Sequence, residues 1–574
     1  MSEEIREATP RQEVQVTLAD GRTFEGPKNK TIETFFKAAG LNDQGHLLAA
    51  LMNGKLRELS TIVREDVRLK PIYMSDSDGV RIYRRSLSFL MIVAAAESFP
   101  DSTITVHHSM PFGGYYCHRN YSDEPDIVVS LSPDELGQLE ARMRELVAAD
   151  LPISQVQVPL DEALKLFRDS GDEEKADLFS KRRKDYLTLY ELAGVRDYFH
   201  GFMVPSTGYL HNFALHSYNN GFILQFPRRH DPMRLQPFED EPRLAHVFQE
   251  YSRWLKVVGA PSVAALNRAI QQGRTKEVIL VAEAFHEQQF AHITEEIASR
   301  RPETKIVLIS GPSSAGKTTF SKRLAVQLLA RGIYPVTIGL DDYFVDRLDT
   351  PLDEQGHLDY ERLEAVDVML FQEHIKDLLR GETIVRPKYN FLTGSREDAD
   401  ELTIGGDHVL IVEGIHALNP RLVEGIPLDA VYRIFLTAFT QLNLDRHNRV
   451  PTTDTRLLRR IVRDAAHRGY NASQTIGRWP SVRRGEKRYI FPNQNNADIF
   501  FNSALVYEVA ALKPLAAPLL LQVEPGTPER IEAQRLLAFL QWFDTVDYDS
   551  IPNDSILREF IGGSIVEEYQ PWLR

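Results

Sequence analysis

The sequence has almost no cysteine: Cys117 is the single thiol in 574 residues. A single thiol can form no internal disulfide, and it cannot supply the cysteine cluster of a structural zinc site. Both absences suit a reducing compartment, and we expect the protein to work in the cytoplasm.

Long apolar runs and a positive net charge are absent as well. No apolar stretch is long enough to span a bilayer, and residues 1–7 are charged and lack the apolar core of a signal peptide. We therefore expect no membrane partner. The formal net charge of -14 argues against a protein that coats nucleic acid, although a local basic groove is compatible with it.

The length exceeds what a single hydrophobic core usually supports, and three or four domains are expected. Strands around one helix predict a β-grasp module near the start, and strands alternating with helices predict a mostly parallel sheet in the second half. We place the boundaries at residues 1–10 (flexible tail), 11–74 (β-grasp), 75–240 (α+β domain), 241–300 (helical linker), 301–515 (α/β domain) and 516–574 (C-terminal helical segment).

The most informative stretch reads KIVLISGPSSAGKTTF from Lys305 to Phe320. Residues 306–309 form a short apolar run typical of a buried strand, and the residues after the glycines have helical spacing. Between them lies G-x-x-x-x-G-K-T, the phosphate-binding loop. Backbone N–H groups and the helix N-terminus would hold phosphate oxygens. The residues predicted to bind ATP or GTP are Gly311, Ser313, Ser314, Ala315, Gly316, Lys317, Thr318 and Thr319.

Phosphoryl transfer also needs Mg²⁺, a base and positive charge on the migrating group. Lys317 would reach the β- and γ-phosphates, and Thr318 would ligate Mg²⁺. Glu413 ends an apolar strand, as a Walker B acid does, and is the second predicted magnesium ligand. Asp341 and Asp342 end another strand, which we expect to lie beside the loop, and an aspartate there can deprotonate an acceptor hydroxyl.

A helix dense in arginine follows Thr453. Arg460 and Arg463 are three residues apart, so that both can face the phosphates from one side of a lid helix. The alternative is a solvated charged face. We expect phosphate contact, because arginine rather than lysine is used.

At these residues the sequence resembles the uridine kinase branch of the phosphoribulokinase/uridine kinase family, over residues 305–503. The matching segments are the loop, Asp341–Phe344, His357–Tyr360, Arg386–Phe391 with Ser395-Arg396, Val412–Ile415 and Thr455–Asp464. The resemblance implies that Asp341 is the catalytic base, with Lys317, Arg460 and Arg463 assisting. It further implies a nucleoside acceptor, bound by Asp359, Tyr389, Arg396 and Arg460, and the cofactors ATP and Mg²⁺.

Three positions depart from that family. A base-contacting histidine falls on Gly394, which offers no side-chain donor and leaves space, and two further substrate-side positions fall on Tyr470 and Arg478. The residues that contact the sugar and the phosphates match those of the family, whereas the residues that contact the base differ. A nucleoside or similar polyol is therefore expected as acceptor, and the preferred base stays open.

The predicted β-grasp module at residues 11–74 resembles the TGS domain of threonyl-tRNA synthetases. Residues 79–90, 99–100 and 113–116 resemble the editing domain that follows it in those enzymes, and the alignment continues through residues 204–205 and 213–215. The four ligand positions of the editing site fall on Arg85, Phe89, Phe199 and Met203. None of these side chains can hold a metal or activate water as the family's ligands do, so editing is predicted to be lost. Nearby histidines lack zinc spacing and are expected to be structural.

The expected fold is thus an α/β P-loop kinase domain with a mostly parallel sheet, preceded by a β-grasp domain and an α+β synthetase-like domain. Two alternatives to a nucleoside kinase remain: an RNA- or tRNA-linked regulatory NTPase, and a kinase of another polyol. The guanine-specific tetrapeptide N-K-x-D does not follow Gly311, which disfavours a GTPase switch. Three roles remain open for the front half: a substrate lid, a homo-oligomer surface and a module that contacts RNA. No role is predicted for the C-terminal segment.

Overall fold

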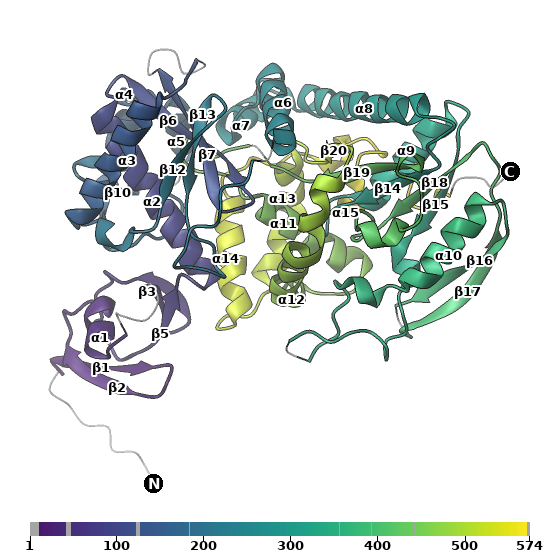
Figure 1. Cartoon of the computed structure of the whole chain (residues 1–574). Helices are drawn as coiled ribbons and strands as arrows, with labels where there is room; N and C mark the ends of the chain where they lie inside the picture. Colours follow the sequence, from purple (N-terminus) through teal and green to yellow (C-terminus); the bar gives the residue numbers. More distant parts are fainter. Residues whose placement is uncertain are drawn as a thin grey trace, which may run out of the picture.

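The computed structural model describes residues 11–41, 47–121, 127–182, 184–240, 242–354, 356–391, 393–440 and 442–570. The flexible tail predicted for residues 1–10 lies outside these residues. The chain runs from a small N-terminal domain through a larger middle domain to the nucleotide-binding half (Figure 1).

The N-terminal domain is a five-stranded sheet around one helix, with strand order β2-β1-β5-β3-β4. Val14, Val16 and Leu18 alternate along β1 and are buried against the helix. The Thr31 side chain accepts a hydrogen bond from the N–H of Thr34 and caps the helix. The predicted β-grasp fold is confirmed. Its elements are β1 (Glu13–Leu18), β2 (Thr23–Pro27), α1 (Ile32–Ala38), β3 (Leu47–Met52), β4 (Lys55–Glu58) and β5 (Val67–Tyr73).

The middle domain packs two long helices against antiparallel strands, as an α+β domain does. One sheet has the order β12-β13-β7-β6, with β8 beside β7, and a smaller sheet has the order β11-β10-β9. The elements are α2 (Ser77–Ser98), β6 (Ser102–Met110), β7 (Gly114–Tyr121), β8 (Val128–Val129), α3 (Pro133–Ala148), β9 (Ser154–Pro159), α4 (Leu160–Asp169), α5 (Glu173–Ser180), β10 (Tyr186–Leu192), β11 (Val195–Asp197), β12 (Ala214–Tyr218) and β13 (Gly221–Gln225).

Three helices then connect the middle domain to the second sheet. They are α6 (Pro242–Val258), α7 (Val263–Gln271) and α8 (Thr275–Ser299). Helix α8 runs along one side of the molecule toward the nucleotide-binding half (Figure 1). The helical reading of this segment is correct.

The second half is built on a parallel sheet with strand order β15-β18-β14-β19-β20. Its strands read as apolar runs because they are buried on both faces. The elements are β14 (Ile306–Ser310), α9 (Lys317–Leu329), β15 (Tyr334–Gly339), α10 (Val368–Leu379), the hairpin β16 (Ile384–Asn390) and β17 (Ser395–Leu402), β18 (His408–Glu413), β19 (Val431–Thr437), α11 (Thr452–His467), α12 (Ala472–Gly485) and β20 (Ile499–Asn502).

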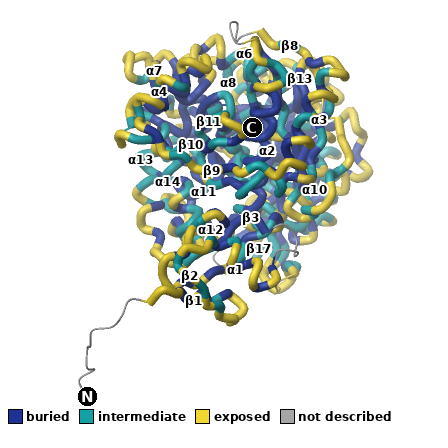
Figure 2. The backbone as a smooth tube through the Cα atoms, turned by 90° about the vertical axis from the view of Figure 1, so that its left-hand side faces the viewer, coloured by how far each residue is buried: buried dark blue, intermediate teal, exposed yellow. Residues whose placement is uncertain are grey.

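The C-terminal helices pack against the lid helix α11 and join its hydrophobic core. They are α13 (Glu508–Leu521), α14 (Pro528–Leu540) and α15 (Arg558–Ile561). Figure 2 shows the buried stretches of chain in the interior and the exposed ones on outer loops and helix faces. Among the residues described, no helix combines the length and apolar character needed to cross a membrane.

Candidate active site

The phosphate-binding loop lies between the end of β14 and the start of α9. Ser314 has φ 60° and Gly316 has φ 90°, so that two residues of the loop adopt the left-handed region. Successive turns of this kind direct backbone N–H groups inward, and glycine adopts such a conformation without steric cost. The loop therefore has the form of an anion cradle, closed by the N-terminus of α9.

Lys317, Thr318 and Glu413 meet at the mouth of this cradle. The Lys317 ammonium donates to the carbonyl of Gly311 at 3.0 Å, and the Thr318 hydroxyl donates to Glu413 Oε1 at 3.1 Å. The other oxygen of Glu413 is buried without a hydrogen-bond partner. Burial raises the pKa of Glu413 to about 7, although Lys317 opposes the shift. A free carboxylate oxygen beside a hydroxyl is a donor set that suits Mg²⁺.

Asp341 and Asp342 follow β15 directly, as predicted, but β15 is not the neighbour of the loop strand. Strand β18, which carries Glu413, lies between β15 and β14. The sequence showed the strands but could not show their order. Asp341 is accessible to solvent and still close enough to act electrostatically on Lys317. Protein atoms around the Asp341 carboxyl still displace part of its hydration and so raise its pKa, and the charge of Lys317 opposes that effect.

Three arginines of the lid helix α11 reach the loop. Arg460 Nη1 donates to the Ser313 hydroxyl at 2.6 Å, and Arg456 Nη2 donates to the Ser313 carbonyl at 2.8 Å. Arg459 Nη1 lies 3.4 Å from the Ser314 carbonyl. Arg460 thus lies against the loop, and its contact with phosphates stays a prediction.

Arg463 is placed differently, because its Nη2 donates to Asp464 of its own helix at 2.7 Å. It still lowers the pKa of Asp341 through its charge, so it lies near the site. Arg456 and Arg459 belong to the arginine-rich pattern, but the pattern predicted no role for either residue. Both are fully buried and form ion pairs, Arg456 with Glu486 and Arg459 with Glu508.

Two further glutamates of the site were missed. Glu486 Oε1 accepts a hydrogen bond from the N–H of Ser313 at 3.1 Å. Glu361 has a buried Oε2 without a partner, and burial, with the negative charge of Glu486, raises its pKa to about 7. Neither residue belongs to a recognisable motif, and a single sequence carries no signal that would have found them.

The residues predicted to bind the acceptor already form hydrogen bonds or ring contacts within the protein. Asp359 Oδ1 accepts from the N–H of Glu361 at 3.1 Å. Tyr389 is buried and packs edge-on against Phe344, with ring centroids 5.5 Å apart. Arg396 Nη1 donates to Asp367 at 3.0 Å, which ties it to the start of α10.

The expectation that Gly394 leaves free space is wrong. Gly394 has φ 77°, and a Cβ placed there would lie 2.5 Å from Nε of Arg347. The Arg347 guanidinium occupies this space and donates to the carbonyl of Phe391 at 2.9 Å. The other two departures, Tyr470 and Arg478, contact each other, with the guanidinium carbon 4.2 Å from the ring centroid.

In the middle domain, the four positions aligned with editing ligands are packed into the protein. Phe89, Phe199 and Met203 belong to the hydrophobic core, with the Phe89 and Phe199 rings 5.1 Å apart. The Arg85 guanidinium donates to the Phe202 carbonyl. His107 and His118 face each other with their Nε2 atoms 3.1 Å apart, and burial lowers the pKa of His118 to about 4. These are structural side chains.

A loop of the second half covers this part of the middle domain. Residues 442–450, here called the docking loop, connect β19 to α11. Its Arg446 carbonyl accepts from the N–H of Val106 at 2.9 Å, and Asn448 Nδ2 donates to the carbonyl of Tyr198 at 3.0 Å. The His447 ring is parallel to that of Phe199, with centroids 6.3 Å apart. The docking loop thus joins the degenerate editing region to the lid helix.

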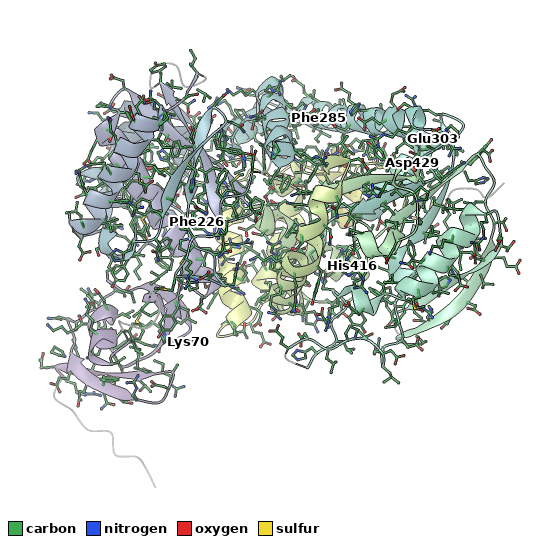
Figure 3. All side chains as sticks on the ribbon, in the orientation of Figure 1. Lys70, Phe226, Phe285, Glu303, His416 and Asp429 are labelled. Atoms are coloured by element: carbon green, nitrogen blue, oxygen red, sulfur yellow. The ribbon has the colours of Figure 1, made fainter. Side chains whose placement is uncertain are left out.

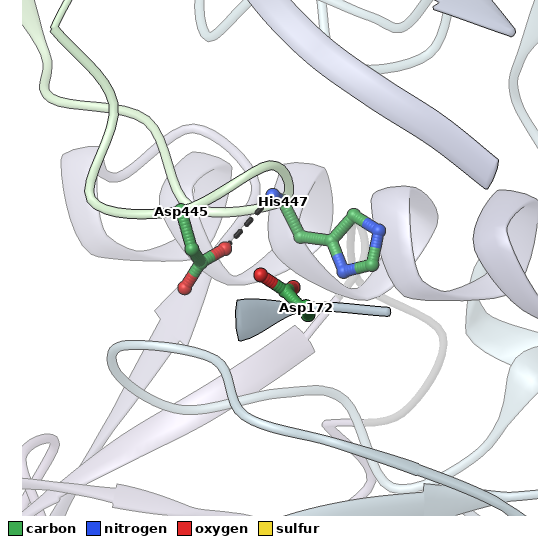
Figure 4. A group of neighbouring side chains, drawn as sticks. All are labelled: Asp172, Asp445 and His447. Atoms are coloured by element: carbon green, nitrogen blue, oxygen red, sulfur yellow. Dashed lines mark hydrogen bonds between the residues drawn. The ribbon is translucent and has the colours of Figure 1, made fainter. Parts of the chain in front are cut away.

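Asp172, Asp445 and His447 are close enough to share a metal ion (Figure 4). The cation among these acids is the ammonium of Lys175, which lies 2.6 Å from Asp197, 3.3 Å from Asp172 and 3.6 Å from Asp445. Burial would raise the pKa of Asp197, but Lys175 and His447 lower it below its ordinary value. This group is a structural ion cluster, because Lys175 and Arg446 already pair with the carboxylates.

Side chains fill the region between the two halves, where Phe226 lies on the middle domain and His416 on the nucleotide-binding half (Figure 3). Arg81 of α2 donates to Glu532 of α14 at 3.0 Å. Arg535, one turn farther along α14, donates to Asp454 of α11 at 2.8 Å. The lid helix is therefore connected to the middle domain by two routes, the docking loop and this chain of ion pairs.

The model of the Phosphoribulokinase / Uridine kinase family matches residues 306–510, and this segment is a domain of that family. The front half matches threonine–tRNA ligases. The ligase of Marinobacter nauticus is 32% identical over 203 residues, which are 35% of this chain and 30% of the ligase. The chain thus spans less than a third of that relative's length.

Two solved structures are similar to part of this chain. One is a possible uridine kinase from Bacillus stearothermophilus, with a TM-score of 0.27 and 15% identity, covering 38% of this chain and 98% of that one. The other is a D-glycerate 3-kinase from Cryptococcus neoformans, with a TM-score of 0.22 and 15% identity, covering 46% of this chain and 89% of that one.

Proposed function

We propose that the protein is an ATP-dependent kinase that phosphorylates a hydroxyl of a nucleoside or a related polyol. The observation that carries the proposal is the meeting of a phosphate cradle, a lysine, a hydroxyl–carboxylate pair and a lid arginine at one edge of a parallel sheet. Family membership of residues 306–510 supports the same reaction class.

In this proposal the loop holds the phosphates of ATP through residues Gly311, Ser313, Ser314, Ala315, Gly316, Lys317, Thr318 and Thr319. Thr318 and Glu413 would hold Mg²⁺, directly or through its waters. When bound, Mg²⁺ supplies positive charge at the β- and γ-phosphate oxygens. The protein contributes the positions of these groups and the exclusion of water around them.

Asp341 takes the proton of the acceptor hydroxyl as that oxygen attacks the γ-phosphorus. The bond from the γ-phosphorus to the bridging oxygen breaks, and ADP leaves with the electron pair. The positive charges of Lys317, Arg460 and Arg463 stabilise the negative charge on the migrating phosphoryl group. The raised pKa of Asp341 suits a general base better than that of an ordinary aspartate would.

Asp359 and Arg460 would bind sugar hydroxyls, and Tyr389 and Arg396 would line the acceptor side. These assignments rest on the resemblance of the residues to the uridine kinase branch. Arg347, which fills the space at Gly394, is a donor that could contact a base edge. We expect ribonucleosides to be used ahead of 2′-deoxyribonucleosides, because a site that loses a hydrogen-bonded hydroxyl leaves its own polar groups unpaired.

An RNA-linked regulatory NTPase is the second candidate. The observation that favours it is the match between the front half and threonine–tRNA ligases. In that case hydrolysis of ATP would depend on tRNA and would not require an acceptor hydroxyl.

The test is consumption of ATP by the full chain, measured against a panel of nucleosides and polyols, with and without tRNA. We expect turnover that requires one acceptor class and is lost in Lys317→Ala. The matched control is Lys305→Ala, whose ammonium donates to the Gly406 carbonyl at 2.7 Å. Consumption that requires tRNA and ignores every acceptor would favour the second candidate. Full turnover in Lys317→Ala would exclude the loop as the active site.

A further inference from the structure

The C-terminal segment, residues 551–569, returns to the phosphate-binding loop. Ile556 packs on the loop so closely that a Cβ on Gly316 would lie 2.5 Å from its side chain. Phe560 lies under the Arg459 guanidinium, with 4.9 Å between the guanidinium carbon and the ring centroid. Lys322 of α9 donates to the carbonyl of Glu567. A segment with no readable chemistry in the sequence therefore forms a wall of the site.

Within this wall, Glu559 contacts the loop's own anion-binding group. Its Oε2 accepts a hydrogen bond from the N–H of Thr319 at 3.1 Å. Thr319 lies in the first turn of α9, where free N–H groups and the helix dipole favour a negative charge. The same backbone N–H groups are the ones that cradle the phosphates of a bound nucleotide in a loop of this type.

Glu559 also interacts electrostatically with the charged residues at the mouth of the loop. Glu559 lies close enough to Glu413 and Lys317 to act on both, raising the pKa of the former and supporting the charge of the latter. One N–H group cannot donate fully to a carboxylate and a phosphate together, and the two anions repel each other. Binding of a nucleotide phosphate at Thr319 therefore requires Glu559 to leave.

We propose that Glu559 is an internal competitor of the nucleotide phosphates, and that residues 551–569 form a gate over the donor site. In the absence of nucleotide the carboxylate occupies the Thr319 N–H. When nucleotide binds, its phosphate takes this N–H and the Glu559 side chain turns away. The inference rests on the proposed function, since it assumes that the loop binds a nucleotide.

The energetic consequence is a weaker apparent affinity, because only the fraction of molecules with a free Thr319 N–H is ready to bind. Replacing Glu559 with alanine removes both the hydrogen bond and the charge. We expect the dissociation constant for Mg·ADP to fall about tenfold, the size of effect that a charge-assisted hydrogen bond supports. Glu559→Gln keeps the shape and loses the charge, and should fall between the wild type and Glu559→Ala.

The experiment is calorimetric titration of the full-length wild type, Glu559→Ala, Glu559→Gln and Lys317→Ala with Mg·ADP. Glu568→Ala is the matched control, because it removes an exposed acid from the same segment and should leave affinity unchanged. A thermal melt of each variant establishes that it is folded, and Glu559→Gln supplies the answer if the alanine variant does not fold.

Equal or weaker binding in both Glu559 variants, with normal binding in the wild type, would overturn the gate and leave the proposed function standing. Tighter binding in Glu568→Ala of the same size as in Glu559→Ala would also overturn it, because the effect would then be one of net charge. Failure of the wild type to bind nucleotide would overturn the proposed function and the gate together.

Discussion

The phosphate-binding site and the editing-like region of the middle domain differ in whether their buried polar groups have hydrogen-bond partners. At the loop, one oxygen each of Glu413 and Glu361 is buried without a partner. In the middle domain, three of the four editing positions hold apolar side chains, the fourth, Arg85, donates to the Phe202 carbonyl, and Lys175 pairs with three aspartates. The loop keeps two buried carboxylate oxygens without partners, whereas the aligned editing positions contribute none of the buried unpartnered atoms.

The difference matters because an unpartnered buried polar group costs about 1–3 kcal/mol of stability. At the loop, a bound cation would supply the partner that the Glu413 oxygen lacks. The editing-like region has no such groups at its aligned positions, and the docking loop adds protein hydrogen bonds across it. The front half is therefore in contact with the loop that leads directly into the lid helix α11.

The largest expected effect is at the proposed catalytic base of the candidate active site. Asp341→Asn should lower kcat by about 10²–10⁴-fold, the usual range for a general base, with little change in nucleotide affinity. The asparagine keeps the size of the side chain and cannot take the proton. The measurement is steady-state kinetics with the acceptor identified by the panel.

Asp342→Asn is the matched control for this substitution, because it changes the adjacent carboxylate of the same turn. We expect a milder loss. If Asp342→Asn were the more damaging change, the base would be Asp342 and our assignment would be wrong.

The next effect concerns the ion cluster of the middle domain. The Lys175 side chain is 1% exposed. Lys175→Met removes the ammonium that Asp172, Asp197 and Asp445 share, and only Asp172 keeps a second cation, Arg446 at 3.5 Å. Removal of one partner from a buried ion pair typically costs about 3–5 kcal/mol. We expect a loss of this order in the free energy of unfolding, measured by urea titration at neutral pH.

Lys165→Met serves as the control, because Lys165 lies exposed on α4 of the same domain. Its stability should match that of the wild type. A Lys175→Met protein as stable as the control would mean that the cluster does not depend on the lysine, and the contrast between the two regions would fail.

Local patterns in the sequence were enough for much of this structure. The apolar run at Ile306, the loop and the helix after it identify themselves by spacing, and the order of elements in the second half follows from alternation. Glu413 and Arg460 lie where the motifs put them, because each is fixed by the strand or helix that carries it. The β-grasp fold was also readable, from its alternating strands and capped helix.

What the sequence could not give are the contacts between distant segments. Glu486 and Glu559 reach the loop from 173 and 240 residues away along the chain. The sheet order that separates Asp341 from the loop strand also depends on long-range pairing. The Arg347 side chain fills the space at Gly394, and this contact between separate segments is encoded by no local sequence pattern.

The smallest expected effect tests whether Glu413 is held in an unfavourable state for the sake of a ligand. Burial raises its pKa from 4.5 to about 7. In the unfolded chain Glu413 ionises near its ordinary pKa, whereas in the folded protein it stays protonated until about pH 7. The wild type therefore loses stability as the pH rises from about 4.5 to 7, and the loss is complete above that range.

Glu413→Gln removes this titration and can still accept the hydrogen bond of Thr318. Its stability relative to the wild type should rise between pH 5 and pH 8 by up to roughly 3 kcal/mol, at about 1.4 kcal/mol for each pKa unit. Chemical unfolding without Mg²⁺ at both pH values measures the difference, and the exposed Glu401→Gln should show none. Added Mg²⁺ should reverse the order at pH 8, because the cation stabilises only the carboxylate that can ionise. If the gain from Glu413→Gln is the same at pH 5 and pH 8, Glu413 is not strained by its burial, and the site is no more prepared for a ligand than the editing-like region is.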